Sequence, residues 1–162
     1  MIARILYLNL LLLSTATLIS CRHDSDPTPS PIPVQPTIDW AKAADSSSQS
    51  LVNNFYNTQG NYFNSQNTGN NYTQFQYWPQ AHALDVMVDA YNRTKGQSYL
   101  NVINNWYNGV YAQNGNTFLG YYYDDEGWNA LAMLRAYDAT GNVQWKNATA
   151  DVRADINTGR YS

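Results

Sequence analysis

The sequence is short of charge, and its few cations are scattered. Charged residues make up 13% of its 162 residues, whereas about a quarter is usual for a globular chain. Nine Lys and Arg stand against twelve Asp and Glu, and no basic cluster is present that could neutralise a row of phosphates. Nucleic acid is therefore excluded as an expected partner.

Aromatic and amide side chains are abundant instead. The chain holds 14 Tyr, 5 Trp and 20 Asn. Aromatic rings pack on the apolar faces of sugars, and amides hydrogen-bond to hydroxyl groups. Such a surface suits a neutral ligand such as a sugar, although it also suits a soluble domain that is simply rich in asparagine.

The single cysteine, Cys21, follows an uncharged apolar run over residues 5–20. This run is interrupted by polar residues and lacks the length of a clean membrane span, but it suits a signal peptide. Leu18-Ile19-Ser20-Cys21 has the form of a lipobox, in which cleavage precedes the cysteine and its thiol takes up a diacylglycerol. We therefore predict a lipoprotein signal peptide over residues 1–20 and a membrane anchor at Cys21. The alternative is a buried free cysteine behind an ordinary signal peptide.

Proline is confined almost entirely to the segment after the cysteine. Five of the six prolines lie between residues 22 and 37. Residues 21–38 are therefore predicted to form an extended tether, partly polyproline II, ahead of one domain over residues 39–162. Asp24 and Asp26 resemble acidic signals for surface export, so the expected location is the outer membrane or the cell surface.

The apolar spacing after the tether predicts five helices, and thus an all-α fold. They are expected over residues 39–56, from Pro79 to 94, from a Ser98 cap to about 111, from Asp124 to a Gly141 cap, and from Trp145 toward the end of the chain. No long strand is expected, although residues 118–123 could pair briefly.

The lengths of the connections between the helices predict where the candidate site lies. Short turns at 95–97 and 140–142 make the helices that they join antiparallel, so the long loops 57–78 and 112–123 lie at the same end. Two clusters, residues 77–82 and 121–128, meet there. This is the arrangement of an α/α toroid with its site at one end of the barrel.

The second cluster contains three consecutive acids, Asp124, Asp125 and Glu126. Carboxylates at a helix start are favoured by the helix dipole, by roughly 0.3–1 kcal/mol each, so helix capping alone is one explanation. Aromatic neighbours on both sides would also desolvate the acids and separate their pKa values. Two carboxylates with separated pKa values are what glycoside hydrolysis uses.

Three ordered motifs make the chain similar to a known family. They are Tyr77-Trp78-Pro79-Gln80-Ala81-His82-Ala83-Leu84-Asp85, Tyr121-Tyr122-Tyr123-Asp124-Asp125-Glu126-Gly127-Trp128, and Leu134-Arg135-Ala136-Tyr137-Asp138-Ala139-Thr140-Gly141. Over residues 39 to about 159 the chain resembles glycoside hydrolase family 76, the endo-α-1,6-mannanases. The resemblance implies an (α/α)6 toroid and retaining cleavage of α-mannan, with Asp124 as nucleophile and Asp125 as general acid/base. No cofactor and no metal are expected from the residues.

Four further residues are candidate sugar contacts: Trp78, Gln80, His82 and Tyr123. Trp78 could stack on a pyranose ring or serve as a hydrophobic staple for its helix, and His82 could bind a hydroxyl group or be a structural histidine. Asp85 and Asp89 lie four residues apart without a third ligand, so a solvated helix face explains them better than a metal site.

The resemblance also implies twelve helices, of which five are predicted here. An incomplete barrel would expose the apolar faces of Leu84, Met87, Leu131 and Leu134, and it would lack sugar contacts from later loops, which argues against full activity of this chain. Two other functions stay open: a noncatalytic surface lipoprotein that binds glycans, and another glycosidase with an α/α toroid.

Overall fold

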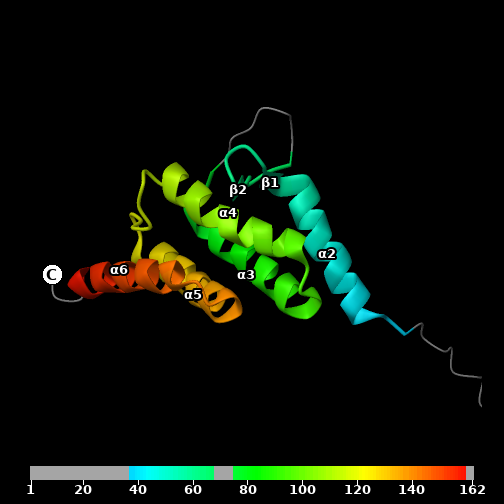
Figure 1. The fold of residues 1–162 in the computed structure, drawn as a ribbon. Coiled ribbons are helices and arrows are strands. Elements are labelled where there is room, and N and C mark those ends of the chain that lie inside the picture. The colour runs from blue at the N-terminus through cyan, green and yellow to red at the C-terminus, as the bar shows by residue number, and fades with distance from the viewer. Residues whose placement is uncertain (1–36, 68–74, 160–162) are drawn as a thin grey trace, which may run out of the picture. The chain divides into compact units, whose positions relative to one another are not determined.

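The computed structural model describes residues 37–67 and 75–159, which form five helices and one short hairpin (Figure 1). In chain order the elements are α2 (Trp40–Phe55), β1 (Tyr56–Asn57), β2 (Tyr62–Phe63), α3 (Tyr77–Thr94), α4 (Gln97–Gln113), α5 (Tyr123–Thr140) and α6 (Val143–Gly159). The predicted all-α fold with five helices is confirmed. The predicted signal peptide, the lipidation of Cys21 and most of the predicted tether lie outside the described residues.

The helix ends follow local signals, with two corrections. Lys95 and Gly141 end α3 and α5 in the left-handed region, with φ of 53° and 70°. Helix α3 begins at Tyr77, so Pro79 is its third residue rather than its first. Proline is tolerated there because the first N–H groups of a helix have no partner within the helix. Helix α4 is capped by Gly96 and not by Ser98.

The hairpin pairs Tyr56 with Phe63 and Asn57 with Tyr62. Sequence reasoning did not predict it, because two-residue strands are too short to show an alternating pattern. No strand forms over residues 118–123 of the described chain, where a brief pairing was considered. None of the helices in the described part of the chain is long and apolar enough to cross a membrane.

Helix α3 is at the centre of the fold, where it packs against α5, α4 and α2, and α5 packs in turn against α6. Contacts between α3 and α5 join residues in the same order along both helices: Tyr77 with Asn129, then Asp85 with Arg135. The two helices therefore run in parallel, as inner helices of an α/α toroid do. Each is followed by a short turn and a partner, α4 or α6 (Figure 1).

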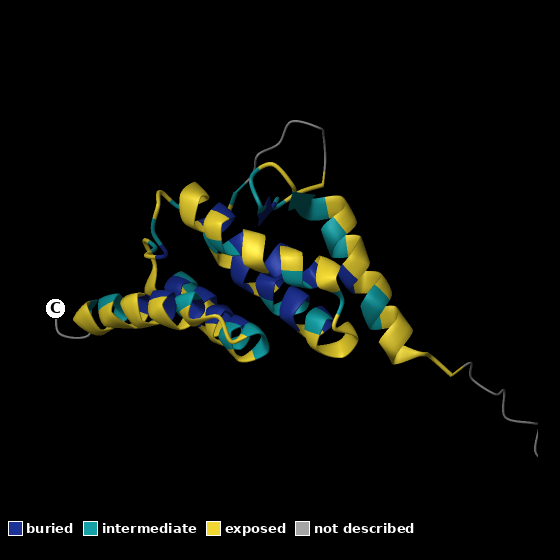
Figure 2. Cartoon of the chain, in the orientation of Figure 1, coloured by how far each residue is buried: buried dark blue, intermediate teal, exposed yellow. Residues whose placement is uncertain are grey.

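The core lies between these helices (Figure 2). Its largest fully buried apolar side chains are Trp106, Trp145, Tyr62, Leu84, Met87, Ile103 and Met133. The expected exposure of Leu84 and Met87 is therefore wrong: these faces of α3 are covered within the five helices. The expected exposure of Leu131 and Leu134 on α5 is confirmed, because no described element covers them.

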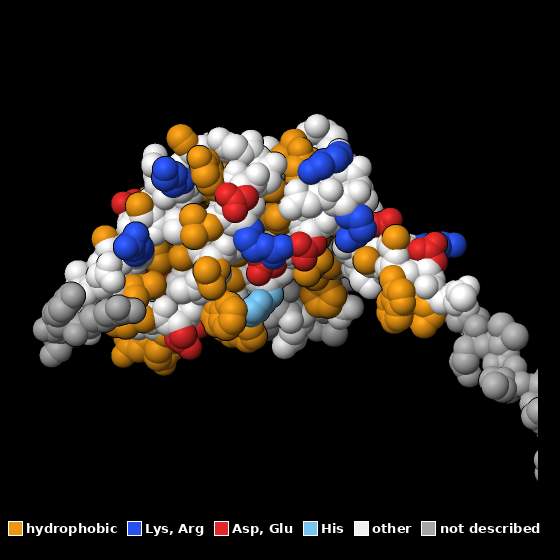
Figure 3. Space-filling model, turned by 90° about the horizontal axis from the view of Figure 1, so that it is seen from below, with side chains coloured by type: hydrophobic (Ala, Val, Ile, Leu, Met, Phe, Trp, Pro, Cys, Tyr) orange, Lys and Arg blue, Asp and Glu red, His pale blue; other side chains and the backbone are white. Residues whose placement is uncertain are grey.

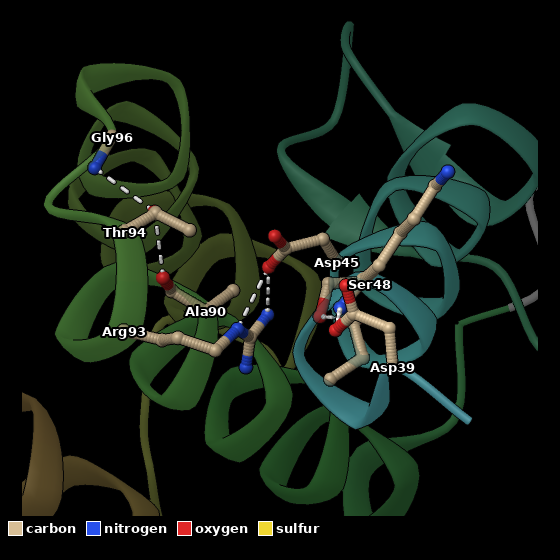
Figure 4. Close-up of polar contacts among 9 residues, drawn as sticks. Asp39, Asp45, Ser48, Ala90, Arg93, Thr94 and Gly96 are labelled. Atoms are coloured by element: carbon tan, nitrogen blue, oxygen red, sulfur yellow. Dashed lines mark hydrogen bonds and ion pairs between the residues drawn. The ribbon is translucent and has the colours of Figure 1, made fainter. Parts of the chain in front are cut away.

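Helix α2 is joined to α3 by an ion pair. Arg93 contacts Asp45 through two nitrogens, each at 2.7 Å (Figure 4). At the start of α2, Asp39 accepts a hydrogen bond from the Lys42 amide at 3.0 Å and caps the helix. Both contacts are largely exposed, so each adds at most about 1 kcal/mol to stability.

Candidate active site

The three consecutive acids occupy the first turn of α5, but they differ in how far they are buried. Asp124 is exposed, Asp125 is half-buried, and Glu126 is fully buried. The residue that caps the helix is Tyr122, whose side chain makes no capping hydrogen bond. The helix therefore begins without using a carboxylate as its N-cap.

The first two acids are free to meet a ligand. Among the hydrogen bonds found in the described residues, none ends on the carboxylate of Asp124 or Asp125, whereas Glu126 accepts one from the Gly120 amide at 2.6 Å. Partial burial raises the pKa of Asp125, and the adjacent Asp124 carboxylate raises it further. The pair thus contains one exposed carboxylate and one carboxyl that holds its proton to a higher pH than an ordinary aspartate.

An aromatic strip lies on the same side of the two inner helices. Trp78 meets His82 edge to face, with ring centroids 5.1 Å apart, and His82 meets Trp128 at 5.4 Å. The two tryptophans are 48% and 49% exposed. Because Trp128 follows Asp124 by four residues on α5, the strip and the acid share one face of that helix. Figure 3 shows a histidine side chain, in pale blue, between apolar side chains on one face of the molecule.

The same face continues into an ion cluster. Arg135 on α5 binds Asp85 at 2.7 Å and also contacts Asp89, both on α3. The two aspartates are therefore partners of a cation rather than simply solvated. Within the described residues no group of three metal-ligating side chains is gathered in one place.

Tyr123 lies beside the acids and is about half exposed. Its ring packs on the end of α6 at Gly159, where an added Cβ would lie 2.5 Å from the Tyr123 hydroxyl oxygen. The ring can take this position only because residue 159 has no side chain. Tyr121 and Tyr122 are also exposed, and their rings meet at 4.8 Å.

The structure places Gln80 away from the other predicted contacts. Its side chain is 1% exposed and binds both the amide and the carbonyl of Phe63, at 2.9 and 2.7 Å, with a third bond to the Gln76 carbonyl. Gln80 therefore fastens the hairpin to α3. It is not positioned to bind a sugar, and the expectation for this residue is corrected.

Sequence reasoning missed a buried polar network behind the acids. The Tyr77 hydroxyl donates to the Phe118 carbonyl at 2.5 Å, and Asn129 donates to the carbonyls of Tyr77 and Asp125 at 3.2 and 3.0 Å. Burial raises the pKa of Tyr77, and the nearby Glu126 and Asp125 carboxyls add to the shift. The polar Asn129 directly before the apolar residues 130–134 is a signal of this network in the sequence.

The comparisons with known proteins identify one family. The family model of glycosyl hydrolase family 76 matches residues 39–159. No curated protein matches the chain significantly.

Several solved structures are similar. The α-1,6-mannanase GH76A of Salegentibacter sp. HEL1_6 is 32% identical, with a TM-score of 0.69. An inactive variant of that mannanase, in which two consecutive aspartates are alanine, was solved with α-1,6-mannotetrose and gives 30% identity and a TM-score of 0.69. The Lin0763 protein from Listeria innocua is 34% identical, with a TM-score of 0.63. The matches cover 73–75% of this chain and 35% of each of the other chains.

Proposed function

The chain belongs to glycosyl hydrolase family 76, and from that premise we propose that it acts on α-1,6-linked mannan as a retaining endo-glycosidase through Asp124 and Asp125. The observation that carries the proposal is the state of this pair: both carboxyls lie at the start of an inner helix, without hydrogen bonds from the described residues, next to exposed aromatic rings. The α-1,6-mannanase solved as an inactive variant had two consecutive aspartates replaced. Asp124-Asp125 is the one such pair in this sequence.

The two carboxyls are suited to different roles. Asp124, the exposed member, would attack the anomeric carbon as a carboxylate and displace the leaving sugar. Asp125, whose pKa is raised by burial and by Asp124, would give its proton to the glycosidic oxygen. In the second step Asp125 would take a proton from water, whose oxygen replaces Asp124 on the sugar.

The aromatic strip supplies the sugar contacts. Trp78, Trp128 and the His82 ring between them form a surface on which a pyranose can stack, and Tyr123 flanks the acids. No cation of the described residues is free on this surface to attract an anion, because Arg135 is paired with Asp85 and Asp89. A neutral polysaccharide such as α-mannan fits these side chains.

Replacement of each aspartate by asparagine tests the proposal. In a chain with the complete barrel, such as a full-length homologue that carries these residues, we expect the parent to release oligosaccharides from α-1,6-mannan. Asp124→Asn should lose this activity by several orders of magnitude, because no other group can make the attack. Asp125→Asn should fail on mannan but keep the first step on an aryl mannoside, whose leaving group needs little protonation.

The alternative roles give different results. If the acids only cap α5, both asparagine variants should keep their activity, because asparagine caps about as well as aspartate. If the chain is a noncatalytic glycan-binding protein, calorimetry should show equal binding of mannotetraose by the parent and both variants, without hydrolysis. Either result would refute the assignment of Asp124 and Asp125.

We also propose that Cys21 carries a lipid anchor that holds the domain at the outer membrane or the cell surface, beyond a tether over residues 21–38. The support is the lipobox form of residues 18–21. Cys21→Ser should abolish labelling by a radioactive fatty acid and release the protein or leave it unprocessed. Equal labelling of variant and parent would contradict the anchor, and protease treatment of intact cells would test surface display.

A further inference from the structure

Glu126 has no part in the proposed chemistry, yet it is the most buried of the three acids. Its side chain is 0% exposed. One carboxyl oxygen, Oε1, accepts the Gly120 amide at 2.6 Å, and the other, Oε2, is buried without a hydrogen-bond partner among the described residues. A buried carboxyl costs stability unless it is neutralised or bonded, so its presence calls for a structural reason.

That reason lies in the segment that leads into α5. Gly120 fits in a slot between two side chains, since an added Cβ would meet the Tyr77 ring at 3.2 Å and the Glu126 Cγ at 3.4 Å. Two residues earlier, Phe118 is held by the Tyr77 hydroxyl. The segment is therefore fixed at two points, once from α3 and once from α5.

The network closes through Asn129. Its amide group binds the carbonyl of Tyr77 on α3 and the carbonyl of Asp125 on α5. The contacts thus form a ring around the start of α5: from Glu126 to Gly120, along the chain to Phe118, to Tyr77, to Asn129 and back to the Asp125 backbone. The Asp125 backbone is part of this ring, and Asp124 precedes it in the first turn of α5.

The charge state of Glu126 fits a hydrogen-bonding role. Burial raises its pKa, the Gly120 N–H lowers it, and Asp155 on α6 raises it again. The raised pKa means that this site favours the neutral carboxyl more than water does, and Oε1 accepts from Gly120 in either charge state. A glutamine has the same shape and also offers an acceptor oxygen.

We propose that Glu126 is a positioning residue: its buried carboxyl anchors Gly120 and thereby fixes the segment 118–122 and the first turn of α5, which carries Asp124 and Asp125. The structural part of this inference stands alone, and only its effect on catalysis rests on the proposed function.

The test compares Glu126→Gln with Glu126→Leu in the full chain. Hydrogen exchange of the Gly120 amide, measured by NMR, reports the anchor directly, and the Asn64 amide, which donates to the Phe55 carbonyl next to the hairpin, is the reference outside the ring. Relative to Asn64, exchange at Gly120 should stay within about threefold of the parent in Glu126→Gln and rise at least about tenfold in Glu126→Leu, as loss of one hydrogen bond predicts.

Two further variants keep the test decisive. Tyr77→Phe removes only the hydroxyl that holds Phe118, and it should also speed exchange at Gly120, even if Glu126→Leu does not fold. Thr149→Val removes a buried hydroxyl that binds the carbonyls of Ala130 and Trp145, outside the ring, and should leave Gly120 unchanged. Unchanged exchange in a folded Glu126→Leu would overturn the anchor. If Glu126→Leu does not fold, unchanged exchange in Tyr77→Phe would overturn it.

Activity on α-1,6-mannan, measured in the chain with the complete barrel, then tests the catalytic consequence. The kcat of the leucine variant should fall by at least about tenfold with little change in KM, because the acids are displaced while the aromatic strip is kept. The glutamine variant should keep the kcat of the parent, because its side chain can still accept the Gly120 hydrogen bond. A glutamine variant that loses activity with Gly120 still protected would show that the charge matters and would refute positioning. If the parent itself does not cleave mannan, the proposed function fails, and the exchange at Gly120 still decides the anchor.

Discussion

Two glycines within helices, Gly109 of α4 and Gly127 of α5, allow a sharp test of the packing. A Cβ added at Gly109 would lie 2.6 Å from the Asn61 carbonyl carbon, with the carbonyl oxygens of Asn61 and Gly60 closer still. A Cβ added at Gly127 meets nothing within 4 Å. The two sites therefore differ in the free space for an added side chain, but both lie within a helix.

The alanine variants separate the two effects. Glycine to alanine in a helix interior adds about 1 kcal/mol of stability at either site. At Gly109 this gain is opposed by overpacking against the hairpin turn, which costs about 1–3 kcal/mol. We expect Gly127→Ala to be stabilised by about 1 kcal/mol, and Gly109→Ala to fall about 1–3 kcal/mol below it.

Urea unfolding followed by circular dichroism measures both free energies of unfolding. The difference between the variants isolates the steric cost, because the stability gained by replacing glycine with alanine in a helix is the same at both sites. A Gly109→Ala variant as stable as Gly127→Ala would refute the close contact between α4 and the turn at residues 60–61. It would also remove the reason for glycine at that position.

Three other perturbations follow from the site. Arg135→Met should lower the free energy of unfolding by no more than about 2 kcal/mol, and by less in 1 M salt, because the lost ion pairs with α3 are partly exposed; equal losses at both salt concentrations would contradict this. Because the pKa of Glu126 is raised, the folded state binds its proton more tightly than the unfolded state does, and the free energy of unfolding should fall as pH rises from about 4.5 through the folded pKa. Glu126→Gln should flatten that decline. A parallel decline in both proteins would exclude Glu126 as its source. Trp128→Ala should weaken mannotetraose binding roughly tenfold by calorimetry, whereas Tyr111→Ala, an exposed aromatic of α4, should not; equal losses would argue against the aromatic strip.

Local sequence determined the helices and where the candidate acids stand. Apolar spacing and the left-handed residues Lys95 and Gly141 are properties of neighbouring residues, and these signals located all five helices to within a few positions. The adjacency of Asp124 and Asp125 is likewise a fact of the sequence, and the motifs around it indicated the family that the comparison with the family model identifies.

Only the tertiary structure decided which polar side chains are buried and bonded within the protein. Gln80 and His82 lie two residues apart in one motif, yet Gln80 binds the hairpin at Phe63 while His82 faces outward between two tryptophans. Among the three acids, Glu126 is buried because Gly120 and Tyr77 reach it from other segments. Such contacts join residues far apart along the chain or on different elements. Their geometry depends on how the helices pack, and no local periodicity records it.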